Sequence, residues 1–121
     1  MPVKKIMVVD DSPTERFFLQ ELLVKNGYAV ITAENGEEAV AKSRGESPDL
    51  ILMDVVMPGL NGFQATRQIA RAPETAHIPI FMCTTKDQET DKIWGVRQGA
   101  KGYLVKPVDA DDLLKKIAEL G

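Results

Sequence analysis

The stretch that decides the fold is residues 3–16, VKKIMVVDDSPTER. A nearly unbroken apolar run ends abruptly in two aspartates, Asp10 and Asp11. Ser12 then precedes Pro13, and a capping hydroxyl followed by a first-turn proline is typical of a helix start. A short apolar run without alternation is typical of a strand covered on both faces, as in a parallel sheet. The stretch therefore predicts a buried strand, a polar loop and a helix, in that order.

The same order recurs four more times along the chain. Each repeat has a short run rich in Val, Ile or Leu and then a segment whose apolar residues follow helical spacing. Alternating strands and helices predict an α/β fold with a doubly wound parallel sheet, right-handed crossovers and helices on both faces. The five expected strands cover residues 3–9, 28–33, 50–53, 78–83 and 102–105.

The expected helices have recognisable boundaries. Short polar side chains that can cap a helix start precede four of them, and glycines that tolerate positive φ follow two of them. In the first helix an apolar stripe is expected to face the core. The capping residues are Asn35, Asn61, Asp87 and Asp109, the glycines are Gly27 and Gly99, and the stripe consists of Phe18, Leu19, Leu22 and Leu23.

Composition limits the class of protein. The length of 121 residues, with 44% hydrophobic and 27% charged residues, indicates one globular domain over residues 1–121 with no output domain. A net charge of −3 disfavours a general nucleic-acid partner. Cys83 is the single cysteine, and its apolar neighbours predict a buried thiol. The sequence has neither a signal-peptide pattern nor an apolar stretch of membrane-spanning length, so we expect a cytoplasmic protein without membrane insertion.

Polar residues occur where the expected strands end. Asp10 and Asp11 follow the first strand, Asp54 the third, Thr84 the fourth and Lys106 the fifth. Each alone has an ordinary explanation as a loop, cap or strand residue. Ligands of such sheets bind at the carboxyl ends of the strands, however, so the five together indicate one shared site.

The charges at this site predict a metal ion. Two unit charges about 4 Å apart interact by roughly 4 kcal/mol at an effective dielectric constant of 20, so three clustered carboxylates need counterions. Lys106 can offset one of them. Mg²⁺ suits the remaining oxygen ligands when the site also takes a phosphoryl group, whereas zinc is disfavoured because no His or Cys cluster is present.

At these residues the sequence resembles the receiver domain of bacterial two-component response regulators, the CheY-like family. The resemblance covers the whole chain, and it implies a (βα)5 flavodoxin-like fold with a five-stranded sheet in the order 2-1-3-4-5. Residues 56–68 and 84–92 look most like the PilH type of receiver, which implies signalling in twitching motility or a chemotaxis-like system. The further motifs that carry the resemblance are Met57-Pro58-Gly59, Gly62, Gly99-Ala100 and Lys106-Pro107.

The resemblance also implies roles for the site residues. Asp54 would be the phosphoacceptor, taking a phosphoryl group from a CheA-like histidine kinase, while Lys106 and Thr84 contact phosphoryl oxygens. The chemistry would be limited to self-phosphorylation and self-dephosphorylation, so the chain is not expected to be an enzyme. Mg²⁺ would be held by the carboxylates of Asp10, Asp11 and Asp54 and by the backbone carbonyl of Val56.

The resemblance also implies which residues pass the signal to a target protein. Thr84 and Tyr103 match the switch pair of the family, and the bond between Lys106 and Pro107 is expected to be cis. A protein target would bind the surface formed by the fourth helix, fifth strand and fifth helix.

The lifetime of the phosphorylated form is expected to depend on Val56 and Lys86. They lie two residues after Asp54 and Thr84, where fast-hydrolysing receivers have polar or acidic residues. An apolar group and a long cation are expected to hinder the hydrolytic water, so the phosphoryl group should be lost slowly.

Other functions remain as alternatives. The chain could drain phosphoryl groups from a kinase that serves a sister receiver, or serve only as a docking module. A Mg²⁺-dependent aspartyl phosphatase of the haloacid dehalogenase type is disfavoured, because Val56 stands where that mechanism needs an acid. A flavin-binding module is disfavoured because Asp10 and Asp11 would repel the flavin phosphate.

Overall fold

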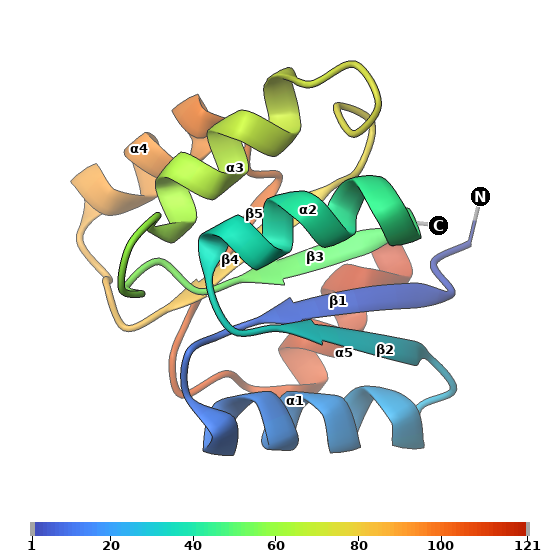
Figure 1. The fold of residues 1–121 in the computed structure, drawn as a ribbon. Coiled ribbons are helices and arrows are strands. Elements are labelled where there is room, and N and C mark those ends of the chain that lie inside the picture. The colour runs from blue at the N-terminus through green and yellow to red at the C-terminus, as the bar shows by residue number, and fades with distance from the viewer. Residues whose placement is uncertain (1, 121) are drawn as a thin grey trace.

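Strands and helices alternate along the chain in the computed structural model, which describes residues 2–120 (Figure 1). The strands are β1 (Lys5–Val9), β2 (Ala29–Ala33), β3 (Leu50–Met53), β4 (Ile80–Thr84) and β5 (Gly102–Val105). The helices are α1 (Pro13–Lys25), α2 (Gly36–Glu46), α3 (Gly62–Arg71), α4 (Glu89–Gln98) and α5 (Ala110–Glu119).

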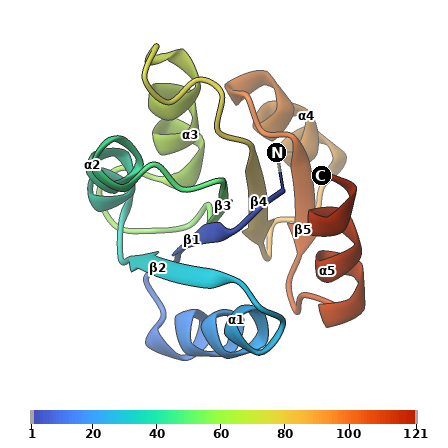
Figure 2. The ribbon, with the colours of Figure 1, turned by 90° about the vertical axis from the view of Figure 1, so that its right-hand side faces the viewer.

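The sheet has the strand order β2-β1-β3-β4-β5, and every neighbouring pair is parallel. Helices α1 and α5 cover one face of the sheet, and α2, α3 and α4 cover the other (Figures 1 and 2). The α/β fold expected from the sequence is thus confirmed. Because β1 and β3 are adjacent, the residues that follow them meet, and the Asp54 N–H donates to the Val9 carbonyl over 2.9 Å.

The core is split between the two faces because successive strand side chains point to opposite sides. All four residues of β3 and all five of β4 are buried. Cys83 is among them, so the predicted buried thiol is confirmed. Burial raises the pKa of this thiol to about 12. The α1 and α5 side of the core includes Ile6, Val8, Leu19, Leu23, Leu52, Leu113 and Ile117, and the opposite side includes Met7, Val9, Ile51, Met53, Ile69 and Met82.

The apolar stripe predicted for α1 is only partly correct. Leu19 and Leu23, one helical turn apart, are buried against the sheet, and Leu22 is half-buried. Phe18 is 47% exposed, because it lies about 100° around the helix from Leu19 and a flat sheet covers only a narrow face.

Most expected boundaries are close to the observed ones. Asn35, Asn61 and Asp109 cap their helices as predicted, and Gly27 and Gly99 have positive φ. The first, second and fourth strands begin one or two residues later than expected. Asp87 is wrong as a cap, since α4 begins one residue later and the Asp91 carboxylate accepts from the Gln88 N–H over 3.3 Å.

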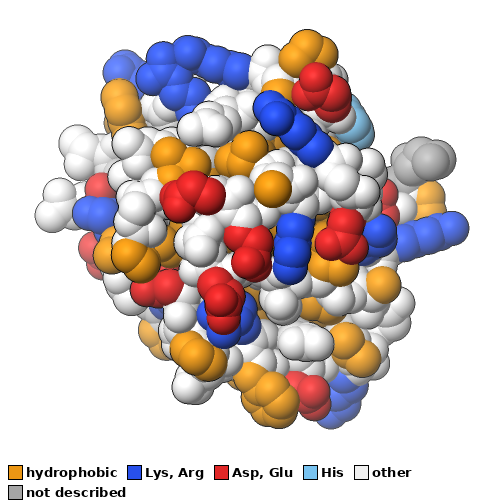
Figure 3. Space-filling view, viewed as in Figure 1, with side chains coloured by type: hydrophobic (Ala, Val, Ile, Leu, Met, Phe, Trp, Pro, Cys, Tyr) orange, Lys and Arg blue, Asp and Glu red, His pale blue; other side chains and the backbone are white. Residues whose placement is uncertain are grey.

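The surface agrees with the composition. On the face shown in Figure 3, Lys and Arg side chains alternate with Asp and Glu and do not form one continuous basic surface. Between residues 2 and 120, no helix combines the length and the hydrophobicity that crossing a membrane requires.

A glycine at the start of α3 keeps two backbone segments in contact. The Gly62 N–H donates to the Val55 carbonyl over 2.9 Å, and a Cβ at this position would lie 2.0 Å from the Asp54 carbonyl oxygen. The close approach requires glycine, because any side chain would displace the backbone that carries Asp54.

We predict that Gly62→Ala lowers the free energy of unfolding by about 2–4 kcal/mol in urea titrations. Gly45→Ala in α2 is the control. A Cβ there meets no atom within 4 Å, and alanine favours the helix by up to about 1 kcal/mol. Equal destabilisation by the two substitutions would contradict the steric explanation.

Candidate functional site

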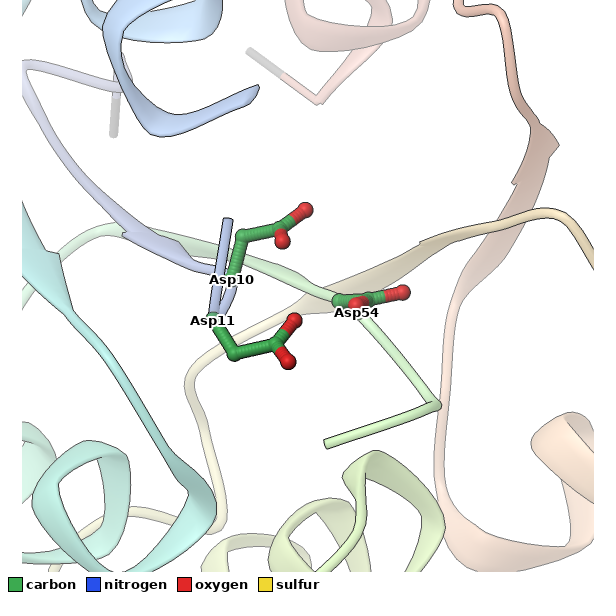
Figure 4. A group of neighbouring side chains, drawn as sticks. All are labelled: Asp10, Asp11 and Asp54. Atoms are coloured by element: carbon green, nitrogen blue, oxygen red, sulfur yellow. The ribbon is translucent and has the colours of Figure 1, made fainter. Parts of the chain in front are cut away.

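Three carboxylates converge beyond the ends of β1 and β3. Asp10, Asp11 and Asp54 each offer an oxygen, and these oxygens lie within 4.8 Å of one another (Figure 4). Asp10 is 2% exposed and Asp54 is also buried, whereas Asp11 is exposed. The cluster is therefore buried at Asp10 and Asp54 and exposed at Asp11.

The ammonium of Lys106, which follows β5, faces two of these acids. Its Nζ lies 2.5 Å from Asp10 Oδ2 and 3.6 Å from Asp54 Oδ1. Burial lowers the pKa of Lys106, but the hydrogen bond to Asp10 and the charge of Asp54 outweigh burial, so the pKa lies above its ordinary value. Lys106 is thus a permanent positive charge at the site.

One ammonium does not neutralise the cluster. Burial, and next the charge of Asp10, raise the pKa of Asp54 to about 6, although Lys106 and the Val55 N–H oppose the rise. The Val55 N–H donates to Asp54 Oδ1 over 2.9 Å. Three carboxylate oxygens with a deficit of positive charge are a donor set that fits a hard divalent cation such as Mg²⁺.

Thr84 and Tyr103 are connected through the loop between β4 and α4. Thr84 is buried, and its Oγ1 accepts from the Lys86 N–H over 3.3 Å. The Tyr103 hydroxyl donates to the Lys86 carbonyl over 2.8 Å, while its ring packs over Gly95. Thr84 therefore binds the backbone N–H of Lys86, and Tyr103 binds the backbone carbonyl of the same residue.

Val56 lies in the loop after β3, and Lys86 lies in the loop after β4. Val56 is 57% exposed, and both residues line a shallow hollow that begins at Val55, next to Asp54. The Lys86 ammonium lies 4.0 Å from Asp91 on α4.

The structure brings Asp10, Asp11, Asp54 and Lys106 together. Thr84 and Tyr103 are joined to Lys86 in the loop between β4 and α4. The peptide bond between Lys106 and Pro107 is cis, as expected. Sequence reasoning missed Arg16, whose Nη1 donates to the Asp10 carbonyl over 2.7 Å. The available signal was a cation one turn into the helix that the acid pair precedes.

The response regulator receiver domain model matches residues 6–118. The chain belongs to this family. It is 60% identical to the protein PilH of Pseudomonas aeruginosa over 113 residues, which are 93% of each chain. The family membership inferred from the sequence is thereby confirmed.

Solved receivers have the same fold. The chemotaxis protein CheY4 of Vibrio cholerae superimposes with a TM-score of 0.91 at 35% identity, over 98% of this chain and 99% of CheY4. The receiver domain of the sensor histidine kinase PA1611 from Pseudomonas aeruginosa gives 0.89 at 28% identity, over 97% and 96% of the two chains. That receiver has a magnesium ion coordinated in its active-site cleft.

Membership assigns the general activity. A receiver is a signalling domain that accepts a phosphoryl group from a histidine kinase and contacts a downstream target. The receiver described here is thus a phosphoacceptor protein of a two-component system, as expected from the sequence.

The raised pKa of Asp54 predicts how stability depends on pH. Between about pH 3.8 and 6 the folded receiver holds a proton that the unfolded chain has released, so raising the pH through this window destabilises the folded state. In EDTA, wild type should therefore lose about 1–2 kcal/mol relative to Asp54→Asn between pH 4 and 6.5. Urea titrations at several pH values measure this difference, and parallel curves for the two proteins would contradict it.

Proposed function

We propose that this receiver is phosphorylated on Asp54 by a histidine kinase with Mg²⁺ and signals through protein contacts that depend on phosphorylation. The observation that carries the proposal is the position of Asp54, a buried carboxylate with a raised pKa between two further aspartates and Lys106. This function requires the cytoplasm, where the ATP used by histidine kinases is found.

Mg²⁺ is proposed to bind between the acids. The carboxylates of Asp10, Asp11 and Asp54 and the backbone carbonyl of Val56 would hold it, and the magnesium-containing receiver domain of PA1611 supports the assignment. When bound, the ion neutralises charge on the phosphoryl oxygens and on the cluster.

The reaction makes and breaks one bond. An Asp54 oxygen bonds to the phosphorus of a phosphohistidine while the bond from phosphorus to the imidazole nitrogen breaks, and its electron pair stays on that nitrogen. Lys106 Nζ, 3.6 Å from Asp54 Oδ1, is within reach of an oxygen of the new phosphoryl group. The Thr84 hydroxyl would donate to a second oxygen. No separate substrate is turned over.

Output is proposed to use the exposed side of α4 with β5 and α5. Three apolar side chains of α4 are exposed: Ile93 and Trp94 at 47% each, and Val96 at 62%. Movement of Thr84 toward the phosphoryl group would free the Lys86 N–H and shift the loop that Tyr103 holds. The 60% identity to PilH supports a role in type IV pilus or twitching motility, with a CheA-like kinase as donor.

The central test is labelling with a phosphorylated histidine kinase, or adduct formation with beryllofluoride and Mg²⁺, followed by mass spectrometry. Wild type should carry the group on Asp54, and Asp54→Asn should carry none. Asp87→Asn, an exposed aspartate outside the cluster, is the control and should be modified normally. Full labelling of Asp54→Asn would overturn the proposal.

The lifetime of the phosphoryl group tests Val56 and Lys86. We expect Val56→Asn and Lys86→Glu to shorten the half-life of the labelled receiver, by about tenfold if the barrier falls by roughly 1.4 kcal/mol. Phe18→Ala, on the surface of α1, is a control whose decay should match wild type. Decay unchanged in both loop variants would show that neither residue hinders the attacking water.

The same labelled kinase distinguishes active output from phosphoryl drainage. If the receiver drains a shared kinase, adding it should reduce the label on a competing receiver, and Trp94→Ala should drain equally well. If it acts through a target, Trp94→Ala should keep its phosphorylation and lose the downstream response.

A further inference from the structure

Arg16 connects three segments at the base of the acid cluster. It is the fourth residue of α1, and its Nη1 donates to the Asp10 carbonyl over 2.7 Å. Its Nη2 donates to Glu34 Oε1, on the loop after β2, over 3.1 Å. The Arg16 side chain is 15% exposed and that of Glu34 is 66% exposed. The contact with Asp10 is therefore the one that is shielded from water.

The Asp10 carbonyl controls the direction of Asp11. Its carbon and oxygen belong to the same rigid planar group as the Asp11 nitrogen. A hydrogen bond that fixes the oxygen thus fixes the plane from which the Asp11 side chain starts. Within residues 2–120 no other hydrogen bond holds this peptide group.

The remaining contacts of Asp10 act elsewhere on the residue. The Asp10 N–H donates to the Ala33 carbonyl over 3.1 Å, and Oδ1 accepts from the Ser12 N–H over 2.9 Å. Lys106 binds Oδ2. These bonds set the strand end, the Asp10 carboxylate and an Asx turn that spans Asp11. Arg16 adds the hydrogen bond on the carbonyl of the peptide group between Asp10 and Asp11.

We infer that Arg16 is a positioning residue for the cation site: it holds the peptide group between Asp10 and Asp11 so that both carboxylates converge on one ion. The inference rests on the proposed function, since it concerns the Mg²⁺ of that site. The guanidinium suits this task because its rigid planar fork directs Nη1 at the Asp10 carbonyl and Nη2 at Glu34 in a fixed geometry, whereas an ammonium is a point charge on a flexible stem.

The charge of Arg16 and its positioning role predict opposite effects on the Mg²⁺ affinity when Arg16 is removed. As a nearby cation, Arg16 repels Mg²⁺, so its removal would tighten binding if only charge mattered. As a positioning residue, its removal releases the peptide group and weakens binding. Loss of such an outer contact typically costs 10–100-fold in metal affinity.

The experiment is calorimetric titration of the folded receiver with MgCl₂, with urea titrations to check folding. Arg16→Ala should weaken Mg²⁺ binding about tenfold or more, and Arg16→Lys should bind with intermediate affinity. Lys42→Ala is the matched control, because Lys42 makes the same kinds of contact, to the Thr32 carbonyl over 2.5 Å and to Glu38 over 3.5 Å, but touches none of the acids. Its affinity should stay within about twofold of wild type.

A spectroscopic readout supplements the affinities. In the metal-free protein, the amide resonance of Asp11 should shift in Arg16→Ala and stay in place in Lys42→Ala. Glu34→Gln removes the exposed ion pair and keeps the bond to Asp10, so it should bind Mg²⁺ like wild type. If Arg16→Ala does not fold, the Mg²⁺ affinities of Arg16→Lys and Glu34→Gln are compared with that of wild type instead.

The outcomes separate the inference from the proposed function. Mg²⁺ binding by Arg16→Ala that equals or exceeds that of wild type overturns the inference and leaves the site itself intact. If Arg16→Ala is unfolded, equal binding by Arg16→Lys and wild type overturns it instead. Absence of Mg²⁺ binding by wild type overturns the proposed site, and the inference with it.

Discussion

The crowding of three acids around one ammonium is the constraint on which the rest of this structure depends. Asp10 and Asp54 follow adjacent strands in the middle of the sheet, so they meet in a place with little water. Burial, and next the charge of Asp10, raise the pKa of Asp54, and the clustered negative charge gives the site its affinity for cations. The unfavourable free energy of bringing these charges together is offset by the hydrophobic core, in which the strands are buried on both faces.

Close backbone packing keeps the acids together against that repulsion. At the Asp54 end, Gly62 allows α3 to begin directly on the carbonyl of the residue that carries the charge. At the Asp10 end, Arg16 and Ser12 of the α1 region hold the backbone and the carboxylate separately. The α1 region thus acts on both the backbone and the carboxylate of Asp10, while Lys106 approaches the carboxylates of Asp10 and Asp54 from the end of β5.

The sequence predicts the sheet and the residues that form the acid cluster with Lys106, because both follow from patterns along the chain. Unbroken apolar runs identify buried strands, and polar residues directly after them lie at one edge. Contacts that depend on side-chain direction are not encoded in this way. The exposure of Phe18, the helix start after Asp87 and the reach of Arg16 back to Asp10 depend on how α1 and α4 lie in space, which spacing along the chain does not specify.

In the β4–α4 loop, Lys86 is held through its backbone, and its side chain makes a separate contact with Asp91. Thr84 and Tyr103 both bind Lys86, yet they use its backbone N–H and carbonyl and ignore its side chain. Any amino acid except proline supplies those two groups. A substitution of Lys86 by another residue would therefore alter the side chain that the proposed function assigns to the lifetime of the phosphoryl group and would leave both backbone contacts in place.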